Sequence, residues 1–340
     1  MPAYERPTRE NLEKYTKFFP GADLESLKRT FKATTQLGTR GAVKGVNLRN
    51  RLTAPNPLLN IPRRNEAVAT DTLYSDTPAV DDGSTAAQFF IGRKSHYRSV
   101  FGLGSSDKRF PEALIDQIKR YGAMDVLISD NAKAEIGKRT KEILRILLTK
   151  DYQSEPYNKN QQFSERGWRD TKTRTSNLLN MSGAPNYCWL LALAYVCFLQ
   201  NHTAYESLNG RTPIEWLLGF TPDITVLLQF IFYEPVYYAK YDESFPGDTT
   251  ELLGRFVRIA ENIGNAMCFL ILTEDLKVIA RSVVRSARKG GGFTNRRANR
   301  LAPKLAPPTP NDDGKTPSRT PVQGCVEPGS ATKKKDEPEQ

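Results

Sequence analysis

Val126-Leu127-Ile128-Ser129-Asp130 is the stretch of the 340-residue sequence that decides the fold. Its short apolar run predicts a buried strand over residues 125–129. An acid that directly follows such a strand needs a partner, because burying an unpaired carboxylate is costly. Asp130 is therefore the first candidate functional residue.

Strand-like and helix-like patterns alternate on both sides of this stretch. Upstream, three strands and a helix are expected over residues 68–74, 86–92, 96–102 and 111–121. Downstream, a helix, a strand and two helices are expected over residues 132–148, 151–154, 164–179 and 186–200. Three antiparallel strands followed by alternating helices and strands predict an α/β fold, with a mixed five-stranded sheet flanked by helices.

The composition changes along the chain and predicts four parts. Residues 1–66 are polar and basic, with one amphipathic helix over 23–37 and an extended linker. Residues 67–225 form the α/β core. Residues 226–287 contain strand-like runs over 232–241, 255–261, 266–272 and 278–285, which are typical of a small β-barrel. Residues 288–340 are basic and proline-rich, a composition that predicts a disordered tail.

The charge and cysteine content limit the classes of function. Lys and Arg total 49 against 38 Asp and Glu, a net charge of +11 that favours nucleic acid first and an anionic membrane second. The four cysteines form no C-x-x-C pair and there are two histidines, so no zinc site is expected. The longest apolar run, residues 187–199, is shorter than the about 20 residues that a membrane helix needs. We expect a soluble intracellular protein without a membrane partner.

Two further acids stand at the ends or edges of predicted elements. Asp71 lies in the first strand, and Glu165 lies at the start of a helix. There are 58 residues between Asp71 and Asp130, and 34 between Asp130 and Glu165. Carboxylates that converge in this way are suited to two Mg²⁺ or Mn²⁺ ions, which drive phosphoryl transfer. The competitors for the first position are acids of a turn-rich loop: Asp76, Asp81 and Asp82.

Three motifs around these acids resemble the catalytic core of a D,D-E integrase, most closely the copia-type integrases of long-terminal-repeat retrotransposons. The motifs are Ala69-Thr70-Asp71-Thr72, Leu127-Ile128-Ser129-Asp130-Asn131-Ala132, and Ser154-Glu155-Pro156-Tyr157 followed by Phe163-Ser164-Glu165-Arg166. The resemblance spans about residues 24–287. It implies an RNase H-like fold, catalytic metal ligands at Asp71, Asp130 and Glu165, and an SH3-like barrel at the C-terminal end. It also implies 3′-end processing of DNA and strand transfer into target DNA.

The sequence departs from the family pattern in three places. The second spacing is one residue shorter than the family's usual 35. The glycine that is common before the family's glutamate is absent, and the upstream zinc domain has no counterpart. These departures leave open an inactive DNA-binding remnant or domesticated module. A nuclease of the RNase H type is a third reading, against which the barrel-like segment argues.

DNA contacts are expected on both sides of Glu165 and in the tail. Arg169 and Lys172 share a helix face with Glu165, and Trp168 is expected to pack, with stacking on DNA as the alternative. The expected DNA-binding residues are Asn160, Gln162, Arg169, Lys172, Arg288, Lys289, Arg296 and Arg297. The basic run at residues 281–304 is compatible with DNA binding or with nuclear import. The resemblance implies element ends and target DNA as partners, a homo-oligomer, and work in the nucleus.

Overall fold

The structure of the chain is a computed structural model. It describes residues 12–36, 61–105, 109–129, 137–153, 163–239, 251–261, 263 and 267–287. The expected tail, residues 288–340, and most of the expected linker lie outside these ranges.

The larger part of the described chain is built around a mixed five-stranded sheet. Its strands are β1 (Ala67–Tyr74), β2 (Ala86–Gly92), β3 (Arg98–Gly104), β4 (Val126–Ser129) and β5 (Lys150–Gln153), in the order β3-β2-β1-β4-β5. Strands β1, β2 and β3 pair antiparallel, whereas β4 pairs parallel with β1 and β5 parallel with β4. The predicted α/β fold with a mixed sheet is therefore confirmed.

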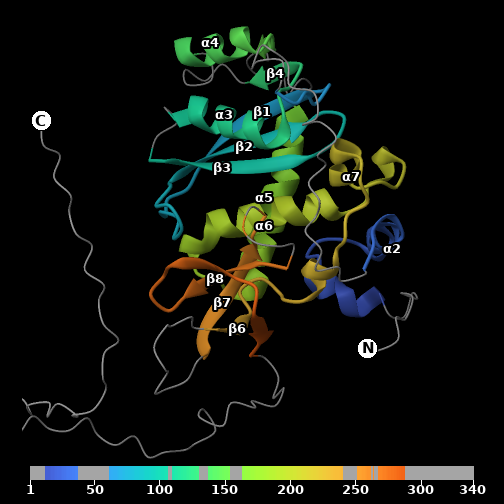
Figure 1. Cartoon of the computed structure of the whole chain (residues 1–340), viewed down its shortest axis with the longest axis vertical. Coiled ribbons are helices and arrows are strands. Elements are labelled where there is room, and N and C mark those ends of the chain that lie inside the picture. Colours follow the sequence, from blue (N-terminus) through green and yellow to red (C-terminus); the bar gives the residue numbers. More distant parts are fainter. Residues whose placement is uncertain are drawn as a thin grey trace, which may run out of the picture. The chain divides into compact units, whose positions relative to one another are not determined.

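Helices cover both faces of this sheet (Figure 1). Helices α3 (Phe110–Tyr121) and α4 (Lys138–Ile146) pack on one face, against a cluster that includes Val68 and Leu127. Helices α5 (Phe163–Ser182) and α6 (Trp189–His202) cover the other face, against Ala69 and Ile128. Neighbouring residues of a strand serve opposite faces because side chains alternate along it.

A second sheet follows near the C-terminal end of the described chain. Its antiparallel strands are β6 (Pro235–Ala239), β7 (Glu251–Ile259), β8 (Phe269–Thr273), β9 (Val278–Arg281) and β10 (Val284–Ser286), in the order β10-β6-β7-β8-β9. The single strand expected over residues 278–285 is instead two strands. A bend at residues 282–283 separates them, so that β9 pairs with β8 and β10 pairs with β6.

The N-terminal part begins with the 3-10 helix η1 (Glu13–Phe18) and helix α2 (Leu24–Ala33). The helix expected over residues 23–37 ends early, because Thr34 is extended and Thr35 forms a parallel bridge with Asp223. The helix expected over residues 186–200 consists of the 3-10 helix η6 (Asn186–Cys188) followed by α6. The short elements of the described chain that were not anticipated are η1, η7 (Glu206–Leu208), α7 (Pro213–Leu218) and η8 (Thr225–Leu228).

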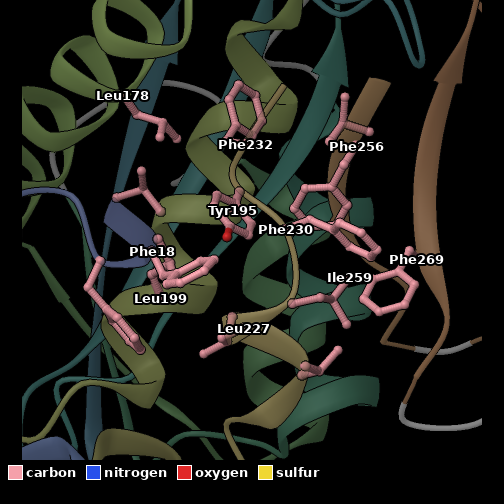
Figure 2. Packing of buried hydrophobic residues seen from close by; sticks show 14 of the residues in the cluster. Phe18, Leu178, Tyr195, Leu199, Leu227, Phe230, Phe232, Phe256, Ile259 and Phe269 are labelled. Atoms are coloured by element: carbon pink, nitrogen blue, oxygen red, sulfur yellow. The ribbon is translucent and has the colours of Figure 1, made fainter. Parts of the chain in front are cut away.

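One apolar cluster joins segments that are distant in the sequence. Phe18 and Leu27 from the N-terminal helices, Tyr195 from α6, and Phe256 and Phe269 from the second sheet all belong to it. Figure 2 shows Tyr195 surrounded by side chains from several of these segments. All described residues fall within one compact unit. The boundaries at residues 66, 225 and 287 remain predictions.

Among the described residues, none of the helices is long and apolar enough to cross a bilayer.

Candidate functional site

Asp71 lies on the face of the sheet that α5 and α6 cover. Its neighbours two positions away, Ala69 and Leu73, pack in a cluster with Leu193 and Cys197 of α6. Because residues i, i+2 and i+4 of a strand share a face, Asp71 lies on that face as well. Its side chain is partly buried, and Phe89 of β2 stands directly opposite it in the antiparallel pair.

Glu165 lies in the first turn of α5, and this end of the helix packs on the strand that pairs with Asp71. Three residues after Glu165, the Trp168 ring lies 5.7 Å from the ring of Phe89, centroid to centroid. Trp168 is a packing residue of this cluster, as expected. Phe89 is the residue that pairs with Asp71 across the two strands. Glu165 therefore lies about one helical turn, or 5.4 Å along the helix axis, from the contact between Trp168 and Phe89.

Gly167 allows this close approach and was not singled out from the sequence. A Cβ atom at Gly167 would lie 2.5 Å from Cδ1 of Ile91 in β2. Real Cβ atoms do not come so close, so a side chain at position 167 would push the helix or Ile91 away. A glycine inside a helical pattern was the available signal, since glycine there costs about 1 kcal/mol relative to alanine.

The carboxylate of Glu165 is held in an ion pair on its own helix. Nη2 of Arg169 donates to Oε1 of Glu165 over 3.0 Å, and the two side chains are 74% and 35% exposed respectively. Arg166 and Lys172 are also exposed on α5. The first half of α5 therefore presents three cations to solvent, beside a partly buried glutamate.

A second acid of α5, Asp170, serves a structural network. It accepts hydrogen bonds from Nε of Arg174 over 3.0 Å and from Nε2 of Gln200 over 2.7 Å. Gln200 also accepts a bond from Thr171 over 2.9 Å. These contacts fix α5 to α6, so that the backbone beneath Glu165 is anchored at the next helical turn.

Asp130 lies outside the described residues, one position beyond the end of β4. The expected DNA contacts Asn160, Gln162, Arg288, Lys289, Arg296 and Arg297 also lie outside them. Within the described ranges, no group of three or more His, Cys, Asp or Glu side chains is arranged to hold a metal ion. The structure thus places Asp71 on the sheet face that α5 covers and Glu165 on α5 itself, and the triad remains a prediction.

The competing acids lie in the connection between β1 and β2. Oδ1 of Asp82 accepts the backbone N–H of Ser84 over 2.8 Å. Its other oxygen lies against Gly102 of β3, where a Cβ would collide with it. Asp82 therefore stabilises this turn. Asp76 is exposed in the same connection.

The described histidines and cysteines have structural surroundings. His202 is buried, with Nδ1 2.8 Å from the carbonyl oxygen of Phe198, and burial lowers its pKa to about 4. The His96 ring stacks on Tyr205, with centroids 6.0 Å apart. Burial raises the pKa of Cys188 to about 11 and that of Cys197 to about 12. Both thiols are protonated at neutral pH, which makes them poor nucleophiles.

Comparison with known proteins gives structural neighbours only. No protein-family model matches the sequence, and no curated protein matches it. Among solved structures, the catalytic core domain of BIV integrase aligns with 46% of this chain and 95% of its own, at 18% identity and a TM-score of 0.37. A chain of the simian T-cell lymphotropic virus intasome, in complex with the PP2A regulatory subunit B56 gamma, aligns with 66% of this chain and 83% of its own length, at 14% identity and a TM-score of 0.37. At these values the function has to be argued from the residues themselves.

Proposed function

We propose that this chain is an integrase-like protein of the copia retrotransposon type, with a metal-dependent DNA strand-transfer core. The observation that carries the proposal is the placement of Asp71 and Glu165. Asp71 lies on the α5-covered face of the central strand, and Glu165 lies in the first turn of that same helix. Two acids from non-adjacent segments are thus presented to one side of the sheet.

Asp130 is the third acid of the proposed site. In the parallel pair of β1 and β4, Ala69 stands opposite Ile128. Asp71 follows Ala69 by two positions, and Asp130 follows Ile128 by two positions. This equal spacing from a register pair supports the choice of Asp130 as the partner of Asp71.

The donor set suits a hard divalent cation. Carboxylate oxygens are the ligands that Mg²⁺ and Mn²⁺ prefer, and Asp71, Asp130 and Glu165 would supply them. Bound ions of this kind stabilise developing charge and activate a hydroxyl for attack on a phosphodiester. The chain's own contribution is to hold Asp71 on a strand and Glu165 on a helix, with Trp168 and Gly167 setting the distance of α5 from the sheet.

DNA is the proposed partner, both as element ends and as target. Arg166, Arg169 and Lys172 are exposed on the helix that carries Glu165, so they would bind phosphates beside the reacting bond. Asn160 and Gln162 precede that helix, and the basic residues Arg288, Lys289, Arg296 and Arg297 would add affinity that does not depend on sequence. We further propose that the second sheet closes into an SH3-like barrel, that the active form is a homo-oligomer, and that the protein works in the nucleus.

The decisive experiment is the substitution Glu165→Gln in the full chain. We expect loss of DNA cleavage and joining while DNA binding persists, because an amide is a poor ligand for Mg²⁺. Asp76→Asn is the matched control, since Asp76 is an exposed acid of the β1–β2 connection. Activity is measured on labelled duplex ends with Mg²⁺ or Mn²⁺. If the unaltered chain joins DNA and Glu165→Gln joins it equally well, Glu165 does not belong to the site.

An inactive DNA-binding remnant is the second candidate. The ion pair between Glu165 and Arg169 favours it, because a cation already occupies one carboxylate oxygen. In that case the unaltered chain binds duplex DNA with a salt-dependent affinity and yields no joined product with either metal. The same assay therefore separates the two candidates.

A further inference from the structure

We propose that Arg169 is a latch on the metal-binding carboxylate of Glu165, and that DNA phosphate releases it. The inference rests on the proposed function and adds a coupling to it. Binding of DNA would raise the affinity for the divalent ion, and binding of the ion would raise the affinity for DNA.

The latch is visible in the ion pair itself. Nη2 of Arg169 lies 3.0 Å from Oε1 of Glu165, at the i,i+4 spacing at which helical side chains meet. A divalent ion that takes this oxygen must displace the guanidinium or share the carboxylate with it. The guanidinium also repels a second cation at this distance. Without DNA, Arg169 therefore lowers the affinity of Glu165 for the ion.

The exposure of Arg169 makes the exchange feasible. Its side chain is 74% exposed, so a phosphate reaches it without displacing packed groups. Lys172 stands three residues later and is also exposed, so a phosphate between them would contact two cations. Arg174 of the same helix is less accessible to a phosphate, because its side chain is 24% exposed and its Nε donates a hydrogen bond to Asp170.

Reciprocity gives the sign of the coupling. If a phosphate withdraws Arg169 from Glu165, the carboxylate gains freedom to bind the ion, and the phosphate cancels the repelling charge. Two ligands coupled through one group must change each other's affinity by the same factor. An exposed pair of this kind is worth about a twofold change in affinity, and the charge repulsion enlarges it.

The test measures Mn²⁺ binding by the full chain, from the electron paramagnetic resonance signal of free Mn²⁺. In the absence of DNA, Arg169→Gln is expected to bind Mn²⁺ at least twofold more tightly than the unaltered chain. Arg139→Gln is the matched control, because Arg139 is 65% exposed and pairs with Glu112 at 4.0 Å on the opposite side of the sheet. It should leave Mn²⁺ binding unchanged. Arg169→Lys keeps the positive charge, so its affinity for Mn²⁺ should lie between that of the unaltered chain and that of Arg169→Gln.

The second arm measures the coupling through the anisotropy of a labelled random-sequence duplex at fixed ionic strength. Mn²⁺ should tighten DNA binding of the unaltered chain, and Arg169→Gln should lose at least half of that enhancement. Lys172→Gln should weaken DNA binding while leaving DNA-free Mn²⁺ affinity as it was. Thermal unfolding confirms that each variant is folded.

The outcomes distinguish a failure of the proposed latch from a failure of the proposed metal site. If Glu165→Gln weakens Mn²⁺ binding but Arg169→Gln behaves as Arg139→Gln does, the latch is wrong and the metal site stands. If Glu165→Gln binds Mn²⁺ as the unaltered chain does, the metal site fails and the latch fails with it.

Discussion

At the scale of single residues, the candidate site depends on a contact that involves no functional group. The first turns of α5, which carry Glu165, can approach β2, the strand that pairs with Asp71, because position 167 has no side chain. The far end of Ile91, buried in β2, fills the space that a Cβ would need. Alanine normally stabilises a helix relative to glycine by about 1 kcal/mol, so the packing at this position opposes the intrinsic preference of the helix.

This opposition can be tested by a double-mutant cycle. We expect Gly167→Ala to lower the free energy of unfolding, because overpacking costs about 1–3 kcal/mol. Ile91→Val removes the Cδ1 atom that lies 2.5 Å from the added Cβ and leaves Cγ1 at 3.8 Å. In that background Gly167→Ala should become neutral or stabilising. Chemical denaturation of the four proteins measures the cycle, and an equal effect of Gly167→Ala in both backgrounds would show that Ile91 does not limit the approach.

At the scale of elements, a side chain of helix α6 pairs with the backbone of one edge strand of the larger sheet. Strand β3 is an edge strand, and unpaired edge groups invite association with other chains. Asn201 of α6 accepts the backbone N–H of Arg98 over 2.8 Å and donates to the carbonyl oxygen of Arg98 over 2.7 Å. Its amide thus pairs with the strand as a neighbouring backbone would, and fixes the position of α6 against β3.

Asn201→Ala should therefore destabilise the chain. Both backbone groups of Arg98 would be left buried without this partner, at about 1–3 kcal/mol for each. Asn180→Ala is the control, because Asn180 is exposed on α5 and its replacement should change stability by less than about 0.5 kcal/mol. Thermal and urea unfolding measure both variants. Equal stability of the two would mean that solvent satisfies the edge of β3 when Asn201 is removed.

At the scale of the whole described chain, the apolar cluster around Tyr195 couples the N-terminal helices, α6 and the second sheet. The Tyr195 ring is 1% exposed and contacts the rings of Phe232 and Phe256, with centroids 5.6 and 5.8 Å away. Phe256 in turn contacts Phe230 and Phe269. Parts that share a core in this way are expected to unfold together.

Phe256→Ala tests this cooperativity in the full chain. The loss of a buried phenyl ring should lower the free energy of unfolding by about 3–5 kcal/mol, and one calorimetric transition should shift as a whole. Native-state hydrogen exchange gives the location of the effect. We expect amides of β1 and β2 to lose protection together with those of β7. Loss of protection confined to the second sheet would show that it folds as an independent unit.

Local patterns were enough to predict the order and type of the main strands and helices of the α/β part. Alternating or continuous apolar runs fixed β1, β2 and β4 to within a residue or so, because a strand's burial pattern is a local property of its side chains. The same local signals led to Asp71 and Glu165 as acids of interest. They also indicated the strands of the second sheet, although not the bend that separates β9 from β10.

Which faces pack against each other could not be read from local patterns. The patterns place Leu27 and Tyr195 on expected helices and Phe256 on an expected strand, but they do not indicate that the three side chains share one cluster. The hydrophobic effect is non-directional, so a pattern of apolar residues specifies that a side chain leaves water without specifying its neighbours. For the same reason the contact of Trp168 with Phe89 became visible only once α5 lay against the sheet. The ion pair of Arg169 with Glu165 is a local contact instead, because side chains four residues apart on one helix are neighbours.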